Sequence, residues 1–239
     1  MKRLILAAMT VAAMTVASTA QAALAYSFLI CQGATCLPFA TNVVVGTTVG
    51  DYTISLAGGS ATQGTLVSDS SQIDLNVTRT GQTSAAPLSV WFTVTGYTSP
   101  TGPTYAFDVS LGAGEQSIDA NSSRGLVTYQ AWYSSTNSTT IPPTGSPTNL
   151  ASCTPPPGAI GITDSCNSNP GPVLVAPGSN LFSIISLTQF FIGLGDTSQY
   201  GAVGQASLAA VVPEPGSMVL LGSGLLGMAA MLRRRHARK

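Results

Sequence analysis

The chain has 239 residues and a formal net charge of zero, but its charges are distributed unevenly. Seven of the nine basic residues lie in the first three and last seven positions, so residues 23–212 hold two arginines against eight acidic residues, a net charge of about −6. This region lacks the basic surface that nucleic-acid binding requires, which excludes nucleic acid as a partner.

Residues 1–22 have the order of a secretory signal peptide. Lys2 and Arg3 precede an apolar run over residues 4–16, and Ala20-Gln21-Ala22 has the small-residue pattern of a cleavage site. As a helix, the apolar run would reach about 20 Å, short of the roughly 30 Å of membrane hydrocarbon. We therefore expect export with cleavage after Ala22, leaving one exported domain over residues 23–211.

Alternation of apolar and polar residues predicts β-strands along most of this domain. The clearest case is residues 88–95, in which Trp91 points to the face opposite Phe92. Further strands are predicted over residues 26–30, 42–49, 52–56, 73–77, 105–109, 126–133, 181–192 and 202–211.

Glycines are expected to end two of these strands. Residues 52–56 precede Gly58-Gly59, and residues 105–109 precede Gly112 and Gly114. Charged residues make up only 8 % of the chain, which disfavours surface helices and suits strands and turns. Together these patterns predict an all-β fold, an antiparallel β-sandwich of Ig-like or jelly-roll-like topology, with a barrel as the alternative.

The segment of about residues 134–172 is rich in Ser, Thr, Pro, Gly and Asn. It is predicted to be an insertion loop, because its few apolar residues cannot build a core. A glycosylated Ser/Thr stretch is the alternative.

Four cysteines lie in the exported domain, where an oxidising compartment permits disulfides. Of the three possible pairings, the local pairs Cys31–Cys36 and Cys153–Cys166 are the most economical. Neither pair has zinc-knuckle spacing and no histidine lies nearby, so neither a metal site nor a cofactor is predicted.

Residues 212–239 consist of three parts. Val212, Pro213, Glu214 and Pro215 come first, an uncharged apolar segment follows over residues 217–232, and Arg233, Arg234 and Arg235 begin a basic end. Basic residues beside an apolar span stay on the cytoplasmic side, so residues 23–212 would lie outside the inner membrane.

This three-part tail resembles the PEP-CTERM sorting signal. The resemblance implies recognition by an exosortase, a membrane-embedded cysteine transpeptidase, which cleaves near the motif and removes the transmembrane helix. It also implies a protein that is anchored transiently in the inner membrane, reaches the cell surface or extracellular matrix, and associates with exopolysaccharide or biofilm. A plain single-pass anchor with a proline-rich stalk is the alternative.

Few residues of the exported domain are suited to catalysis. The only histidine, His236, lies in the basic end, which excludes a Ser-His triad and a histidine zinc site from residues 23–211. The main prediction is a non-catalytic surface or matrix protein. A secreted glycoside hydrolase is an alternative, with these candidate acids: Asp69, Asp74, Asp108, Glu115 and Asp119.

A binding module is the other alternative, either for carbohydrate or for calcium-dependent adhesion. Exposed aromatic rings stack on sugars, and Trp91 and Trp132 are the main candidates, with Tyr97 and Tyr133 beside them. Core packing is the competing role for each. Calcium would need paired acids, Asp69 with Asp74 or Glu115 with Asp119.

Overall fold

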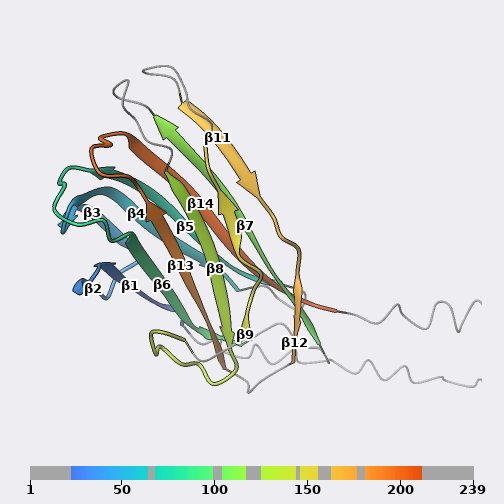
Figure 1. The fold of residues 1–239 in the computed structure, drawn as a ribbon. Helices are drawn as coiled ribbons and strands as arrows, with labels where there is room; N and C mark the ends of the chain where they lie inside the picture. Colours follow the sequence, from blue (N-terminus) through green and yellow to red (C-terminus); the bar gives the residue numbers. More distant parts are fainter. Residues whose placement is uncertain are drawn as a thin grey trace, which may run out of the picture.

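The computed structural model describes residues 23–63, 68–98, 104–116, 125–143, 146–155, 163–176 and 181–211. Its regular structure there is entirely β, in two antiparallel sheets packed face to face (Figure 1). The all-β prediction is therefore confirmed. The predicted signal peptide, transmembrane helix and basic end lie outside the described residues. In the described part of the chain, no helix is long and apolar enough to cross a membrane.

Sheet A has the strand order β10-β8-β13-β6-β1-β2, and β9 also pairs with β8. Its strands are β1 (Ala25–Gln32), β2 (Thr35–Phe39), β6 (Leu88–Tyr97), β8 (Leu126–Ser134), β9 (Ser146–Pro147), β10 (Ala151–Cys153) and β13 (Phe182–Phe191).

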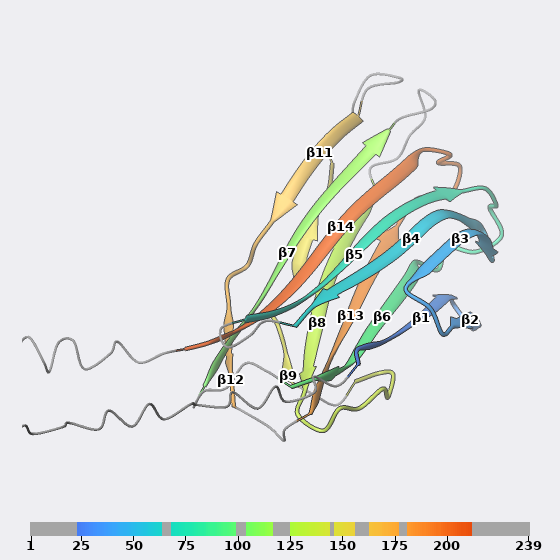
Figure 2. The ribbon, with the colours of Figure 1, turned by 180° about the vertical axis from the view of Figure 1, so that it is seen from behind.

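Sheet B has the order β11-β7-β14-β5-β4-β3, and β12 also pairs with β7. Its strands are β3 (Val43–Val49), β4 (Tyr52–Thr62), β5 (Ser68–Arg79), β7 (Tyr105–Gln116), β11 (Thr163–Ser168), β12 (Val173–Val175) and β14 (Gln199–Ala210). Figure 2 shows β7, β14, β5 and β4 side by side. β13 lies in the middle of sheet A and β14 in the middle of sheet B, so neither sheet is complete until these two late strands have paired.

One face of each sheet forms the core. In β6 the predicted alternation holds, since Leu88, Val90, Phe92 and Val94 are all buried against the other sheet. A Cβ on Gly59 would lie 2.2 Å from Cζ of Phe92, so this glycine makes room for the ring. The prediction that β4 stops at Gly58-Gly59 is wrong, because the strand continues to Thr62 with Gly59 packed against the core.

A buried ion pair lies at one end of the sandwich, between two residues of sheet B. Arg79, 1 % exposed, lies at the end of β5, and its Nη2 is 3.4 Å from Oδ2 of Asp51. Arg79 also donates to the carbonyls of Ile192, just beyond β13, and of Ser84. Asp51 accepts hydrogen bonds from the Thr83 hydroxyl (2.6 Å) and the Ser84 N–H (2.8 Å). These bonds, that of Thr83 foremost, lower the pKa of Asp51 to about 2.

Part of the predicted insertion loop is regular structure. Residues 134–172 supply β9 and β10 to sheet A and β11 to sheet B. Because these are short strands along β8 and β7, they need few apolar side chains and gain their backbone hydrogen bonds from the neighbouring strands.

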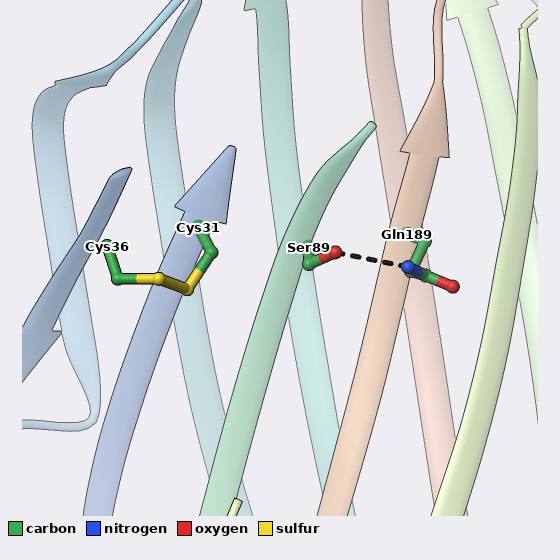
Figure 3. The surroundings of a disulfide bond; sticks show 4 residues. All are labelled: Cys31, Cys36, Ser89 and Gln189. Carbon is green, nitrogen blue, oxygen red and sulfur yellow. Dashed lines mark hydrogen bonds between the residues drawn. A yellow bond between two sulfur atoms is a disulfide. The ribbon is translucent and has the colours of Figure 1, made fainter. Parts of the chain in front are cut away.

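Both predicted disulfides are present. As Figure 3 shows, a bridge joins Cys31 on β1 to Cys36 on β2, where the two residues are opposite each other. Their Cα atoms are 4.1 Å apart. Cys153 on β10 bonds Cys166 on β11, so this bridge joins the two sheets.

Candidate functional site

The two tryptophans meet on the outer face of sheet A. Trp91 lies on β6 and Trp132 on β8, and β13 runs between these strands. Their neighbours Phe92 and Tyr133 are buried in the core, so alternation turns both indoles outward, where they are half-buried. The ring centroids are 5.6 Å apart, with the planes tilted by 37°. The structure thus brings together two side chains 41 positions apart in the sequence.

The indole pair rests on a packed base. Across the strands, Leu187 is opposite Trp91, and Ile185 is opposite Trp132. Ile185 lies on the outer face by alternation, yet it is 0 % exposed. Neighbouring side chains on this face therefore cover it, which limits the rotamers of the two rings.

The apolar surface continues across the sheet on both sides of the pair. Leu29 on β1 is opposite Trp91, Pro38 on β2 is opposite Leu29, and Pro147 on β9 is opposite Trp132. We call this set the aromatic strip; its members are Pro38, Leu29, Trp91, Leu187, Ile185, Trp132 and Pro147.

Uncharged polar groups border the aromatic strip. In the next row, the Cys31–Cys36 bridge lies beside Ser89, which is opposite Gln189 (Figure 3). Nε2 of Gln189 donates to Oγ of Ser89 at 3.1 Å. Neither the strip nor this row contains a charged residue, so recognition here would depend on ring stacking and neutral hydrogen bonds.

The two candidate tyrosines belong to the core instead. Tyr97 is 0 % and Tyr133 3 % exposed, so neither reaches a ligand. Gly96, with a φ of +90°, breaks the alternation of β6 and turns Tyr97 inward, where its hydroxyl donates to the Ser70 carbonyl at 2.8 Å. Tyr133 occupies an inner position of β8 and packs against Phe182.

Of the two acid pairs proposed for calcium, the structure describes both members of one, Asp69 with Asp74, and these do not form a site. Asp69 and Asp74 are five positions apart on β5, so they lie on opposite faces, and Asp69 is fully buried. Glu115 is buried, and burial raises the pKa of its carboxyl, while Asp119 lies outside the described residues. Among the described residues, no group of three or more His, Cys, Asp or Glu could hold a metal ion.

The sorting motif follows the last strand directly. β14 ends at Ala210, and the N–H of Val211 donates to the Thr104 carbonyl at 2.9 Å. Val212, Pro213, Glu214, Pro215 and Arg233, Arg234, Arg235 lie outside the described residues. A family model described as the PEP-CTERM protein-sorting motif matches residues 211–235. The comparison with curated proteins gave no match.

Proposed function

We propose that this PEP-CTERM protein, whose sorting motif directs export and exosortase processing, is a non-catalytic component of the cell surface or extracellular matrix that binds uncharged polysaccharide. The observation that supports polysaccharide binding is the Trp91–Trp132 pair, held outward on a packed base. Indole rings present a large apolar face to the C–H groups of a sugar, and the N–H supplies a hydrogen-bond donor. The tilt of 37° between the rings suits a chain whose successive sugar faces turn relative to one another.

Charge supports an uncharged ligand. The exported region has a net charge of about −6, which repels acidic polymers. The aromatic strip holds no cation that could offset this repulsion. A neutral glycan avoids the penalty and still offers C–H faces and hydroxyls.

The placement of carboxylates supports a non-catalytic role. Glycoside hydrolysis needs two carboxylates that flank one bond in an open site. Glu115 and Asp196 are buried at 5 % and 2 % exposure. The outer face of sheet B has a groove along β5, β14 and β7, and Asp74 is the one carboxylate among its described lining residues. We therefore retain binding in preference to hydrolysis.

The test is affinity electrophoresis of the exported protein, purified after expression of the full chain. Gels contain a neutral glucan or, in a parallel set, the acidic polymer alginate. We expect retardation by the glucan, and Trp91→Ala or Trp132→Ala should weaken apparent affinity at least about tenfold, as loss of a buried aromatic anchor does. Leu174→Ala is the control, because Leu174 is 68 % exposed on β12 of the other sheet.

Two results would contradict the proposal. The first is a wild-type protein that no neutral polysaccharide retards. The second is equal retardation of the tryptophan variants and the wild type. Mass spectrometry of the same purified protein tests the exosortase step, since a C-terminus near Glu214 is expected and an intact basic end would refute processing.

A further inference from the structure

The outer face of sheet B contains a groove that is separate from the aromatic strip of sheet A. The groove has a volume of about 400 Å³, and a second hollow of about 360 Å³ adjoins it. The two share Gly112, Asn167 and Val203 in their linings, so they form one continuous depression. We call it the sheet B groove.

The strand register explains why this face is hollow. Gly201 on β14 is opposite Gly114 on β7, and both turn outward, so the middle of the face lacks side chains there. The flanking strands carry longer outward residues, Asn76 on β5 and Asn167 on β11. From β5 to β11 there are three inter-strand spacings, about 14 Å in all. The result is a trough with a glycine floor and two polar walls.

The polar walls hold donors and acceptors but no cation among the described lining residues. Asn76 and Asn167 offer carboxamides, which donate and accept at once, and Gln205 adds a third at the adjoining hollow. Hydrogen bonds already orient the side chains of Asn76 and Asp74. Nε2 of Gln199 donates to Oδ1 of Asn76 at 2.6 Å, and Nε2 of Gln72 donates to Oδ1 of Asp74 at 3.4 Å. Pre-oriented groups lose less freedom when a ligand binds.

The apolar floor of the groove and the negative charge of Asp74 restrict the class of ligand further. Val203, 45 % exposed, and the bare glycine backbone form an apolar base. The Asp74 carboxylate accepts hydrogen bonds from hydroxyls and repels anions. β7, β14 and β5 are each paired on both sides within the sheet, so an extended peptide lying over these strands would find no free strand edge to pair with. A hydroxyl-rich neutral chain with apolar C–H faces satisfies each of these features.

We propose that the sheet B groove is a second, independent binding site for an uncharged polysaccharide chain. It lies on the outer face opposite the aromatic strip, so one domain holds two chains and cross-links them. The ligand class follows from the lining of the groove itself, and the site does not depend on the tryptophans.

Gly201→Val tests the site with little disturbance of the fold. A Cβ at Gly201 would meet nothing nearer than the Leu75 carbonyl oxygen at 3.8 Å, an ordinary contact, so the new side chain fills the groove. Gly58→Val is the matched control, since a Cβ there meets nothing within 4 Å and Gly58 is not in the groove lining. Asn167→Ala, which removes a wall carboxamide and adds no bulk, covers the case in which Gly201→Val fails to fold.

The variants are made in the exported protein with and without Trp91→Ala plus Trp132→Ala. A weaker retardation by a neutral glucan should persist in the tryptophan double variant, and Gly201→Val should then weaken it further by at least about tenfold, while Gly58→Val leaves it unchanged. The wild type should raise the viscosity of a glucan solution, and blocking either face should abolish the rise.

The experiments distinguish failure of the groove proposal from failure of the aromatic-strip proposal. The groove proposal is overturned if neither Gly201→Val nor Asn167→Ala changes retardation in either background, whatever the tryptophans do. Stronger retardation by alginate than by glucan also overturns it. A concentration-dependent dimer in analytical ultracentrifugation that Gly201→Val abolishes would assign the groove to a second copy of the chain and refute the proposal.

Discussion

Replacing Arg79 with Met should destabilise the domain more than any surface substitution. The substitution keeps the apolar stem and removes the guanidinium, which pairs with Asp51 and donates to the carbonyls of Ile192 and Ser84. Both members of the pair are nearly inaccessible, at 1 % and 3 % exposure, so water cannot replace the lost partner. Nε of Arg79 also donates to the Gly81 carbonyl at 3.1 Å, so the substitution leaves a buried carboxylate without its cation and three carbonyls without their donor.

Breaking a buried ion pair by removing one partner costs about 3–5 kcal/mol. Domains have a total stability of about 5–15 kcal/mol, so the loss is a large share of it. With a urea m-value of about 2 kcal/mol/M, the unfolding midpoint should fall by about 2 M. Arg79 also joins β5 of sheet B to the end of β13 in sheet A through its hydrogen bond to the Ile192 carbonyl, so unfolding should remain a single cooperative transition.

The assay is urea unfolding of the purified exported protein, followed by tryptophan fluorescence. Asp51→Asn and the double variant complete a thermodynamic cycle. Asp51→Asn should cost less in the Arg79→Met background than in the wild type, because the ion pair is then already gone. A midpoint shift below about 0.5 M, or strictly additive effects in the cycle, would refute this account.

Two further predictions concern the same domain. Replacing Cys153 and Cys166 with Ala should cost about 3 kcal/mol of stability, and replacing Cys31 and Cys36 with Ala about 2 kcal/mol. The bridged residues are 13 and 5 positions apart, and the chain entropy that a bridge removes grows with loop length. Urea midpoints test this order, and a larger loss for the shorter loop would contradict it. The pKa of Asp51 is lowered to about 2, so its contribution to stability is present above about pH 4 and is lost as the pH falls towards 2. Unfolding midpoints between pH 2 and 6 should show this decline in the wild type and a weaker one in Asp51→Asn; parallel curves would count against it.

The glycines show the limit of predicting strand ends from local sequence patterns. A glycine is a good local signal for a strand end, and on that basis two strands were expected to stop at Gly58-Gly59 and before Gly112 and Gly114. In the structure β4 and β7 run through these positions. Gly59 makes room for Phe92 of the facing sheet, and Gly112 and Gly114 line the sheet B groove. The residues expected to end strands are the ones that shape the packing and the candidate site.

The tryptophans also show what local patterns can and cannot predict. Alternation predicted that Trp91 faces away from Phe92, which the structure confirms. Alternation could not show that β13, about 95 residues further along, would place Leu187 opposite Trp91 and bring Trp132 beside it. Tyr97 was a poor candidate for a related reason, since the irregular Gly96 reverses its face.

Local sequence patterns are enough to predict the features that are contiguous or nearly so: the sorting motif, the face of each residue in a regular strand, and the two disulfides between close neighbours. The aromatic strip, the sheet B groove and the buried Arg79–Asp51 ion pair depend on the tertiary fold. The physical reason is that side-chain periodicity is local, whereas strand order and register follow from packing between segments that are tens to more than a hundred residues apart. Both candidate sites arise from that register.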